Sequence, residues 1–458
     1  MAFPSTEHRA APTLSVAGLI GRVRAILADK SDSRIAQLMA GKVFFVRVTN
    51  AVLMLVSQVL LARWMGAHEY GIFVYAWTWV LMIGALSDMG LSSAARRFIP
   101  EYTQLKAFEK LRGFLTGSLW LSLGIATVIG GIGAACVFLL KPWLDHFLVI
   151  PLYLACLMIP IYGLVQIQAG IAHSYDWHNL ALLPFYIIRT LALTALVGGA
   201  WLIGAPTDAV TATLIATITV YAVTVGQLIV LHRRLKKNVP AGPKQYEVKT
   251  WLATAFPLFA VEAFYTLQSY VDILALEHFR SPDEVAVYYA GARLLAIVAF
   301  VNFAIAGATT HKFAEYHVAG DKQRLATFFA ETIRWTFWPS LAVCLGILVL
   351  GKPLLSLFGA NFDAGYSVMF ILAIGLMGRA AVGPAERLLT MLDQRTQCVG
   401  IYALAFFVNL GLCIVLIPPF GIEGAGASTA AALIVESILL YIVARRRLGL
   451  PILPFRQA

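Results

Sequence analysis

Long apolar segments constrain this chain more than any other feature of its sequence. They recur along nearly its whole length, each about 20 residues or longer, and short polar stretches separate them. A helix of about 20 apolar residues crosses the hydrocarbon core of a bilayer. With 60% hydrophobic and 13% charged residues, against about 25% charged in soluble domains, the chain is not an ordinary soluble enzyme. We predict an all-α polytopic membrane protein.

Twelve segments of this kind can be delimited, and together they define the predicted membrane topology. They cover residues 42–64, 72–95, 113–140, 149–172, 180–203, 209–231, 250–276, 286–310, 332–350, 366–384, 397–418 and 424–444.

The distribution of basic residues orients these spans. The net charge is +11, which by itself would suit nucleic acid, but most Lys and Arg lie in alternate connections, as expected for the cytoplasmic side of a membrane protein. The other side carries only Arg63, Lys141, Arg280 and Lys352. We therefore expect both termini in the cytoplasm and no nucleic-acid partner.

The first 41 residues are predicted to be a basic cytoplasmic tail. Basic residues interrupt its apolar stretches, which argues against a cleaved signal peptide. Apolar residues at helical spacing between Val16 and Leu27 predict an amphipathic helix on the membrane surface, with a disordered tail as the alternative. The five cysteines have no CxxC or CxxH spacing, so we interpret them as core residues and predict no metal site.

The connection 233–249 carries Pro240, Gly242 and Pro243 and divides the chain into lobes at 42–232 and 250–445, with a tail at 446–458. A shift of 214 residues aligns Val74-Tyr75-Ala76 with Tyr288-Tyr289-Ala290. This weak internal repeat, with six spans in each half, predicts two lobes in the same membrane orientation. Transporters use such parallel repeats for alternating access.

Outside connections of about a dozen residues or fewer leave no room for a folded extracellular domain. Function is therefore expected within the helical bundle. This argues against a membrane-embedded glycan polymerase or ligase, because such an enzyme would need a larger outer loop with catalytic side chains.

Three stretches resemble the polysaccharide and oligosaccharide flippases of the multidrug/oligosaccharidyl-lipid/polysaccharide exporter superfamily. The first is Leu61–Tyr102, the second is Leu357–Ala373, and the third is Pro418–Thr429. The residues that carry the likeness are Gly66, Tyr70, Gly71, Asp88, Gly90, Leu91, Arg97, Gly421, Gly424 and Ala425.

This resemblance implies two six-helix lobes around a central cavity that opens alternately to each side of a bacterial cytoplasmic (inner) membrane. The implied cargo is a polyprenyl-diphosphate-linked oligosaccharide, moved from the inner to the outer leaflet. A polysaccharide polymerase and export machinery are implied partners besides the membrane lipids. A cation-coupled drug or metabolite exporter of the same superfamily is the alternative.

Polar residues within the spans are candidates for the cargo site, because charges inside a bilayer are costly. Arg47, Asn50 and Gln58 share one helical face, and Glu262 and Asp272 share another with Tyr265 and Ser269. Under the repeat, Gln58 corresponds to Asp272. We expect both faces to point towards the axis between the lobes.

Arg189 and Arg293 lie some 12–14 Å into their spans, too deep for easy snorkelling. Together with Arg47, Asn50 and Gln58 they form the predicted substrate site, in which arginine suits a diphosphate. The alternative is that Arg189 or Arg293 pairs with Glu262, Asp272 or a carbonyl at a helix end.

Four further residues are candidates for ion coupling or gating. Glu262 and Asp272, if held at depth, would suit proton coupling, and sodium coupling also stays open; no other cofactor is predicted. Asp88 is expected to pair with Arg96 or to form a gate contact. Pro257, one turn before Glu262, is the predicted hinge.

Overall fold

The computed structural model describes residues 32–392 and 394–448, except for the side chains of residues 32–48, 258, 308 and 395. The chain divides into two compact units, Met1–Thr49 and Asn50–Ala458. The contacts reported below lie within the second unit.

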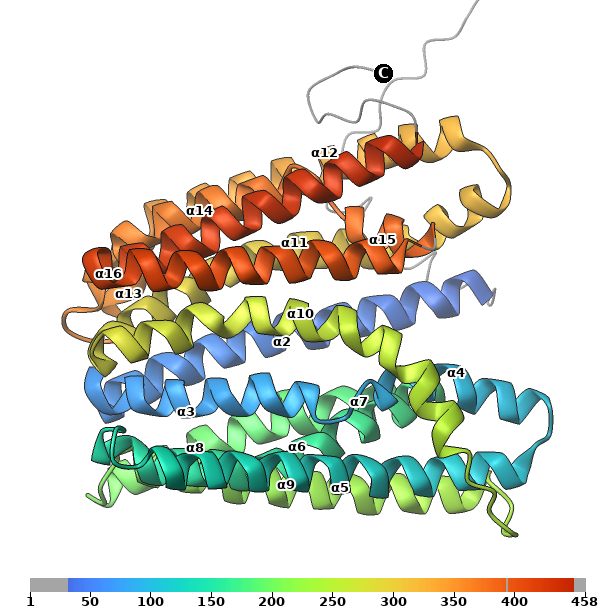
Figure 1. Ribbon diagram of the computed structural model, residues 1–458, viewed down its shortest axis with the longest axis horizontal. Helices are drawn as coiled ribbons and strands as arrows, with labels where there is room; N and C mark the ends of the chain where they lie inside the picture. Colours follow the sequence, from blue (N-terminus) through green and yellow to red (C-terminus); the bar gives the residue numbers. More distant parts are fainter. Residues whose placement is uncertain (1–31, 393, 449–458) are drawn as a thin grey trace, which may run out of the picture. The chain divides into compact units, whose positions relative to one another are not determined.

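All the secondary structure of the described residues is helical (Figure 1). The first half holds α2 (Asp32–Met65), α3 (Ala67–Leu86), α4 (Leu91–Gln104), α5 (Phe108–Leu140), α6 (His146–Ser174), α7 (His178–Leu182), the π-helical segment η1 (Leu183–Ile188), α8 (Arg189–Leu202) and α9 (Ala209–Asn238). The second half holds α10 (Val248–Phe279), α11 (Pro282–Val318), α12 (Lys322–Val349), α13 (Gly351–Ser356), the 3₁₀ segment η2 (Phe362–Gly365), α14 (Tyr366–Ala380), α15 (Ala385–Met391) and α16 (Arg395–Leu448).

Nine helices among the described residues are long and apolar enough to cross a membrane, or ten when the bent α10 is included. The difference from twelve predicted spans has two sources. The first predicted span lies in α2 (Asp32–Met65), of which only Thr49–Met65 belongs to the part with described side chains. The last two spans form the single helix α16, which is interrupted at Gly421 (φ 58°, ψ −129°). Because positive φ values are accessible mainly to glycine, Gly421 lets the chain turn back, so that α16 is a pair of antiparallel rods (Figure 1).

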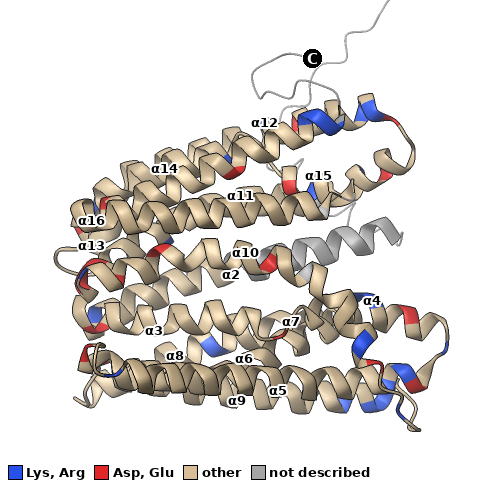
Figure 2. Ribbon diagram, viewed as in Figure 1, with Lys and Arg blue, Asp and Glu red and all other residues tan. Residues whose placement is uncertain are grey.

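Two ends of the bundle can be defined from the connections. The linker end carries residues 105–107, 239–247 and 319–321, and the opposite end carries residues 141–145, 203–208 and 280–281. Lys and Arg gather at the linker end, around the connections α4–α5 and α9–α10 (Figure 2). This arrangement follows the charge asymmetry of the sequence.

Close helix packing in the first half depends on residues without side chains. A Cβ atom at Gly170 of α6 would lie 2.5 Å from the carbonyl oxygen of Ser92 in α4, and one at Gly84 of α3 would lie 2.6 Å from the ring of Tyr162 in α6. Small residues let helix backbones approach inside a bilayer, where the hydrophobic effect does not drive helices together. Helix α6 can therefore pack against α3, α4 and α5 at once.

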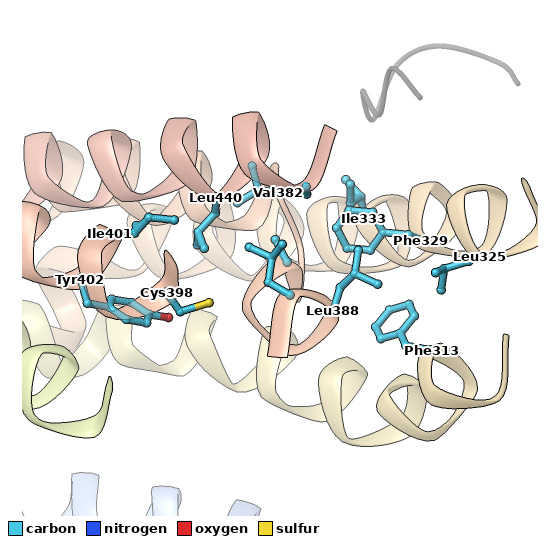
Figure 3. Packing of buried hydrophobic residues seen from close by; sticks show 13 residues of the cluster. Phe313, Leu325, Phe329, Ile333, Val382, Leu388, Cys398, Ile401, Tyr402 and Leu440 are labelled. Carbon is cyan, nitrogen blue, oxygen red and sulfur yellow. The ribbon is translucent and has the colours of Figure 1, made fainter. Parts of the chain in front are cut away.

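In the second half, α11, α12, α15 and α16 share a core that is filled by large side chains (Figure 3). Phe313, Leu388 and Tyr402 are fully buried there. The dense packing fixes the short helix α15 against its longer neighbours.

The connection between the halves is shorter than the predicted 233–249. Helix α9 continues to Asn238 and α10 begins at Val248, so only residues 239–247 are non-helical. This linker is pinned to the first half, because the Gln245 backbone N–H donates to the carbonyl of Glu109 at 3.0 Å and Arg112 donates to the carbonyls of Pro243 and Pro240.

The first turns of α10 also pack against helices of the first half. Trp251 is fully buried and packs edge-on against Phe114 of α5, with 5.2 Å between ring centroids. Helix α10 then bends by 49° between Val248–Pro257 and Phe259–Phe279, because a proline removes a backbone hydrogen bond. The bend lies at Pro257, while its role as a moving hinge stays a prediction.

Gly170→Ala tests the close packing of α6 on α4. The added methyl group would overlap the Ser92 backbone, so we expect a loss of about 1–3 kcal/mol in stability, read as a lower unfolding temperature in detergent. Gly124→Ala is the matched control, because nothing lies within 4 Å of its Cβ position. Equal unfolding temperatures for the two variants would contradict this packing.

Acidification should release the linker. Glu247 accepts a hydrogen bond from Lys110 at 2.8 Å, which, with the Tyr102 hydroxyl at 3.1 Å, lowers the pKa of its carboxyl below 4.5. A lowered pKa means that the contact is complete above about pH 4.5 and is lost as the pH falls through the folded-state value. A spin label on Cys in the variant Ala241→Cys should therefore become more mobile as the pH falls below about 4.5. Glu247→Gln should be mobile already at pH 7, whereas Glu109→Gln should behave as wild type at both pH values.

Candidate functional site between the two halves

The two halves meet where the repeat-related helices α3 and α11 pack against each other. A Cβ atom at Gly71 would lie 1.8 Å from the carbonyl oxygen of Pro282, so only glycine permits this approach. Close to it, the rings of Tyr70 and Tyr289 meet edge-on at 6.3 Å. The contact brings aromatic side chains of both halves into one cluster.

Arg293 of α11 lies in this cluster. Its guanidinium carbon stands 4.6 Å from the centroid of the Tyr289 ring, and Tyr70 and Tyr270 are within electrostatic range. Such cation–π stacking contributes about 0.5–2 kcal/mol, the larger values where water is excluded. Arg293 also lines a cavity of about 120 Å³.

Asn50 and Gln58 of α2 line the same cavity, so three of the five predicted substrate residues converge. Gln58 accepts a hydrogen bond from the Tyr70 hydroxyl at 2.6 Å. The Oδ1 atom of Asn50 is buried without a hydrogen-bond partner among the described residues. An unsatisfied buried acceptor is costly, and it suits a ligand that brings a donor. The side chain of Arg47 lies outside the described residues.

Arg189 is positioned by the π-helical segment η1, which contains Pro184 and immediately precedes it. Such π-helical turns are rare and frequently mark functional sites. The guanidinium carbon lies 4.8 Å from the Trp77 ring and 4.5 Å from the Phe185 ring, and Nε donates to the Phe185 carbonyl at 3.0 Å. The arginine is thus held between aromatic rings and is only 5% exposed.

Tyr289 lies within electrostatic range of both Arg189 and Arg293. Neither arginine forms an ion pair with a carboxylate of the described residues. The alternative pairing with Glu262 or Asp272 is therefore not what the structure has, whereas the alternative of a backbone carbonyl applies to Arg189, whose Nε donates to the Phe185 carbonyl. A guanidinium stacked by its face keeps N–H groups at its edge, which suit the paired oxygens of phosphate. We call Arg189, Arg293 and Tyr289 the arginine–tyrosine cluster.

Asp272 lies apart from this cluster, buried inside the second half. Its Oδ2 atom accepts hydrogen bonds from the hydroxyls of Tyr288 at 2.5 Å and Thr429 at 2.8 Å. The Tyr288 hydroxyl stands in turn 3.5 Å from Thr429. The predicted polar face of α10 is therefore divided, since Tyr265 and Ser269 are exposed and Asp272 is enclosed.

Glu262 is exposed, and it forms no hydrogen bond or ion pair with a described residue. Asp88 caps the start of α4, because its two carboxylate oxygens accept the backbone N–H groups of Gly90 and Ser92, each at 3.0 Å. Asp88 does not pair with Arg96 among the described contacts. Within the described part of the chain, no group of three or more His, Cys, Asp and Glu side chains could hold a metal ion.

A buried ion pair in the second half was not predicted. Arg379 of α14 lies 3.6 Å from the fully buried Glu436 of α16, which also accepts a hydrogen bond from Gln268 at 3.0 Å. Arg379 stacks on the exposed ring of Tyr265 at 5.4 Å. Sequence spacing gives no signal for a pair that is 57 residues apart. The aromatic partners of the other two arginines had a signal, because Phe185 and Tyr289 each lie four residues before an arginine, on the same helical face.

The opposite end is closed by contacts between the halves. Arg63 donates to the carbonyls of Leu357 and Ser356 at 2.5 and 3.3 Å, and His68 lies 3.0 Å from Asp283. These contacts join the two halves at the end of the bundle where α11 begins.

Comparison with protein families gives two matches. The family described as "Polysaccharide biosynthesis protein" matches residues 41–313, and the MatE family matches residues 257–421.

Similar proteins agree with these families. The "Probable low-salt glycan biosynthesis flippase Agl15" of Haloferax volcanii is 22% identical over 408 residues, which cover 87% of this chain and 81% of that protein. Among solved structures, an inward-facing multidrug resistance MATE transporter of the MOP superfamily superposes with a TM-score of 0.73 at 14% identity, covering 89% of this chain and 98% of its own. The lipid II flippase MurJ in an inward closed conformation gives 0.68 at 13% identity, covering 88% and 87%. The MOP-like all-α membrane fold is thereby confirmed.

Substitution of Asp272 should separate a structural role from ion coupling. Asp272→Ala leaves the buried hydroxyls of Tyr288 and Thr429 without their acceptor, so we expect a loss of about 1–3 kcal/mol, measured as a lower unfolding temperature. Asp272→Asn keeps one acceptor oxygen and should lose less. Asp363→Ala, at an exposed side chain without a hydrogen bond or ion pair to a described residue, should leave the unfolding temperature unchanged. If Asp272→Asn also transports normally, coupling through this carboxylate is excluded.

Proposed function

Because this chain belongs to the polysaccharide biosynthesis protein family, we propose that it is a flippase for a polyprenyl-diphosphate-linked oligosaccharide. It would move this cargo from the inner to the outer leaflet of a bacterial cytoplasmic membrane by alternating access. Family membership and the MOP-like fold support transport within the bundle. Neither identifies the cargo, so the argument for a lipid diphosphate comes from the arginine–tyrosine cluster.

The observation that carries the proposal is the pair of arginines without described carboxylate partners. Arg189 and Arg293 come from different halves and both lie in range of Tyr289. Two positive charges at this depth are costly unless a partner or water offsets them. A diphosphate supplies matching negative charge and several acceptor oxygens, and it leaves the aromatic stacking intact. The unpaired Asn50 Oδ1 atom beside Arg293 would accept a donor from a hydroxyl of the sugar.

Alternating access needs contacts that form on one side and break on the other. The contacts of Arg63 and His68 with the second half would close the outer side, since the linker end carries the positive charge typical of cytoplasmic faces. Two of the similar solved structures are described as inward-facing and inward closed. In this scheme the cargo enters from the inner leaflet, and both termini lie in the cytoplasm.

Coupling to a proton or sodium gradient is part of the proposal. Glu262 is suited to it because it is exposed and has no described partner, so a proton or cation can reach it without breaking a structural bond. Asp272 is less suited, because two hydroxyls already satisfy it. The 49° bend at Pro257 lies one turn from Glu262, which would let a change in charge there act on the angle of α10.

Further partners follow from the cargo. A polysaccharide polymerase and export machinery would act on the oligosaccharide after translocation, and membrane lipids surround the spans. The cation-coupled drug exporter is the competing function, because a MATE transporter superposes with a TM-score of 0.73, against 0.68 for the flippase MurJ. A drug exporter for organic cations would not be expected to present two unpaired arginines to its cargo.

Arg293→Ala tests the proposed site. A hydrogen bond to a charged group contributes about 1.5–3 kcal/mol, so we expect affinity for the lipid diphosphate to fall roughly 10-fold to 100-fold. Arg293→Lys should keep part of the activity, because lysine retains the charge and loses the planar fork. The measurement is the leaflet distribution of lipid-linked oligosaccharide in cells depleted of the wild type, read by accessibility to an external glycan-modifying enzyme.

Arg97→Ala is the matched control, because Arg97 is 64% exposed and its described contacts, an ion pair with Glu101 and the Phe98 ring at 5.8 Å, lie on its own helix α4. The Arg97→Ala variant should restore the normal leaflet distribution of lipid-linked oligosaccharide. Normal translocation by Arg293→Ala at equal abundance would contradict the diphosphate site. An unchanged distribution on depletion of the wild type would contradict the flippase and favour the exporter.

A further inference from the structure

A second site lies on the first half, away from the arginine–tyrosine cluster. A groove of about 870 Å³ runs between α5, α6, α9 and the linker. No residue of helices α10 to α16 lines it, so it does not belong to the cavity between the halves. The groove lies on the surface of apolar helices, so we expect it to face the lipids of the bilayer.

The groove has a basic end and an apolar length. Arg233, Lys236 and Lys244 lie at the linker end, all exposed, and none of the described residues that line the groove is acidic. From Arg112, the apolar wall along α5 continues to Leu123. The eleven residue steps from Arg112 to Leu123 rise about 16 Å along a helix, close to the ~15 Å thickness of one hydrocarbon leaflet.

The site is already formed by fixed contacts. Arg112 is held by the carbonyls of Pro240 and Pro243, and the Gly113 backbone packs so closely on the linker that a Cβ atom would lie 1.7 Å from the Gln245 carbonyl oxygen. The linker therefore forms a firm wall of the groove. The remaining basic side chains, Arg233, Lys236 and Lys244, form no ion pair with a described carboxylate.

We propose that this groove binds an anionic phospholipid of the inner leaflet. Its phosphodiester head group lies between Arg233, Lys236 and Lys244, and one acyl chain follows α5 past Leu119 and Trp120. A basic pocket at the cytoplasmic end of apolar helices has the charge and depth that such a head group requires. The bound lipid would contact α9, the linker and α5 together and so hold the connection between the halves in place.

Trp120 provides a direct test, because it lines the groove and is 70% exposed. Full-length protein is placed in vesicles that contain brominated phosphatidylglycerol or brominated phosphatidylcholine. Quenching of Trp120 is the fluorescence difference between wild type and Trp120→Phe. We expect half-quenching at a mole fraction of phosphatidylglycerol several-fold lower than of phosphatidylcholine.

The triple substitution Arg233→Gln, Lys236→Gln, Lys244→Gln should remove this preference, since each basic residue near an anionic surface contributes appreciably to attraction. All three side chains are exposed, and an unchanged unfolding temperature would show that the fold is intact. The control substitutes Arg445, Arg446 and Arg447 by Gln at the end of α16. This control has the same charge change at the linker end and should keep the preference.

Three outcomes would overturn the proposal. Equal quenching by both lipids would make the groove an ordinary lipid contact. Displacement by an equal amount of unbrominated polyprenyl diphosphate would make it a cargo site, and displacement by millimolar inorganic phosphate would make it a phosphate site. Because transport is not the readout, failure here leaves the flippase function untested, and failure of the Arg293 experiment leaves the lipid groove standing.

Discussion

The stacking of two arginines on aromatic rings is the interaction on which the proposed function depends. A guanidinium within the membrane is costly, and a carboxylate partner would neutralise it but also occupy its donors. Trp77, Phe185 and Tyr289 instead contact the faces of Arg189 and Arg293. In Arg189, Nε donates to the Phe185 carbonyl and Nη2 lies 3.5 Å from the Thr190 hydroxyl, so the donors left for an anionic cargo are the remaining N–H groups of the two guanidinium groups.

This arrangement requires the two halves to approach closely. Gly71 brings α3 against the Pro282 carbonyl, and the π-helical turn before Arg189 sets that side chain between two rings. The same halves are joined at the linker end by Glu247, Lys110 and the buried Trp251. The central cluster and the linker are thus connected through α10, whose bend at Pro257 lies between them. A lipid bound beside the linker would act on this connection from the bilayer.

The sequence predicted the membrane fold, the position of the bend and three residues that line one cavity. Asn50, Gln58 and Arg293 could be predicted together because polar residues on an apolar helix are costly and rarely incidental. The hydrogen-bond partners of the acidic residues could not be predicted in the same way. Asp88 and Asp272 are satisfied by local backbone groups and by hydroxyls from other elements. Helical spacing carries no information about those partners.

By itself, the sequence determined that this protein lies in a lipid bilayer and that its spanning segments are helices. Both follow from local composition and from the length needed to cross a bilayer. It also determined where charge accumulates. The tertiary structure decided which buried charges are paired, joining Glu436 to Arg379 and leaving Arg189 and Arg293 to aromatic rings. Pairing depends on which faces of distant helices meet, and that is set by close contacts such as Gly71 on Pro282, which no local pattern encodes.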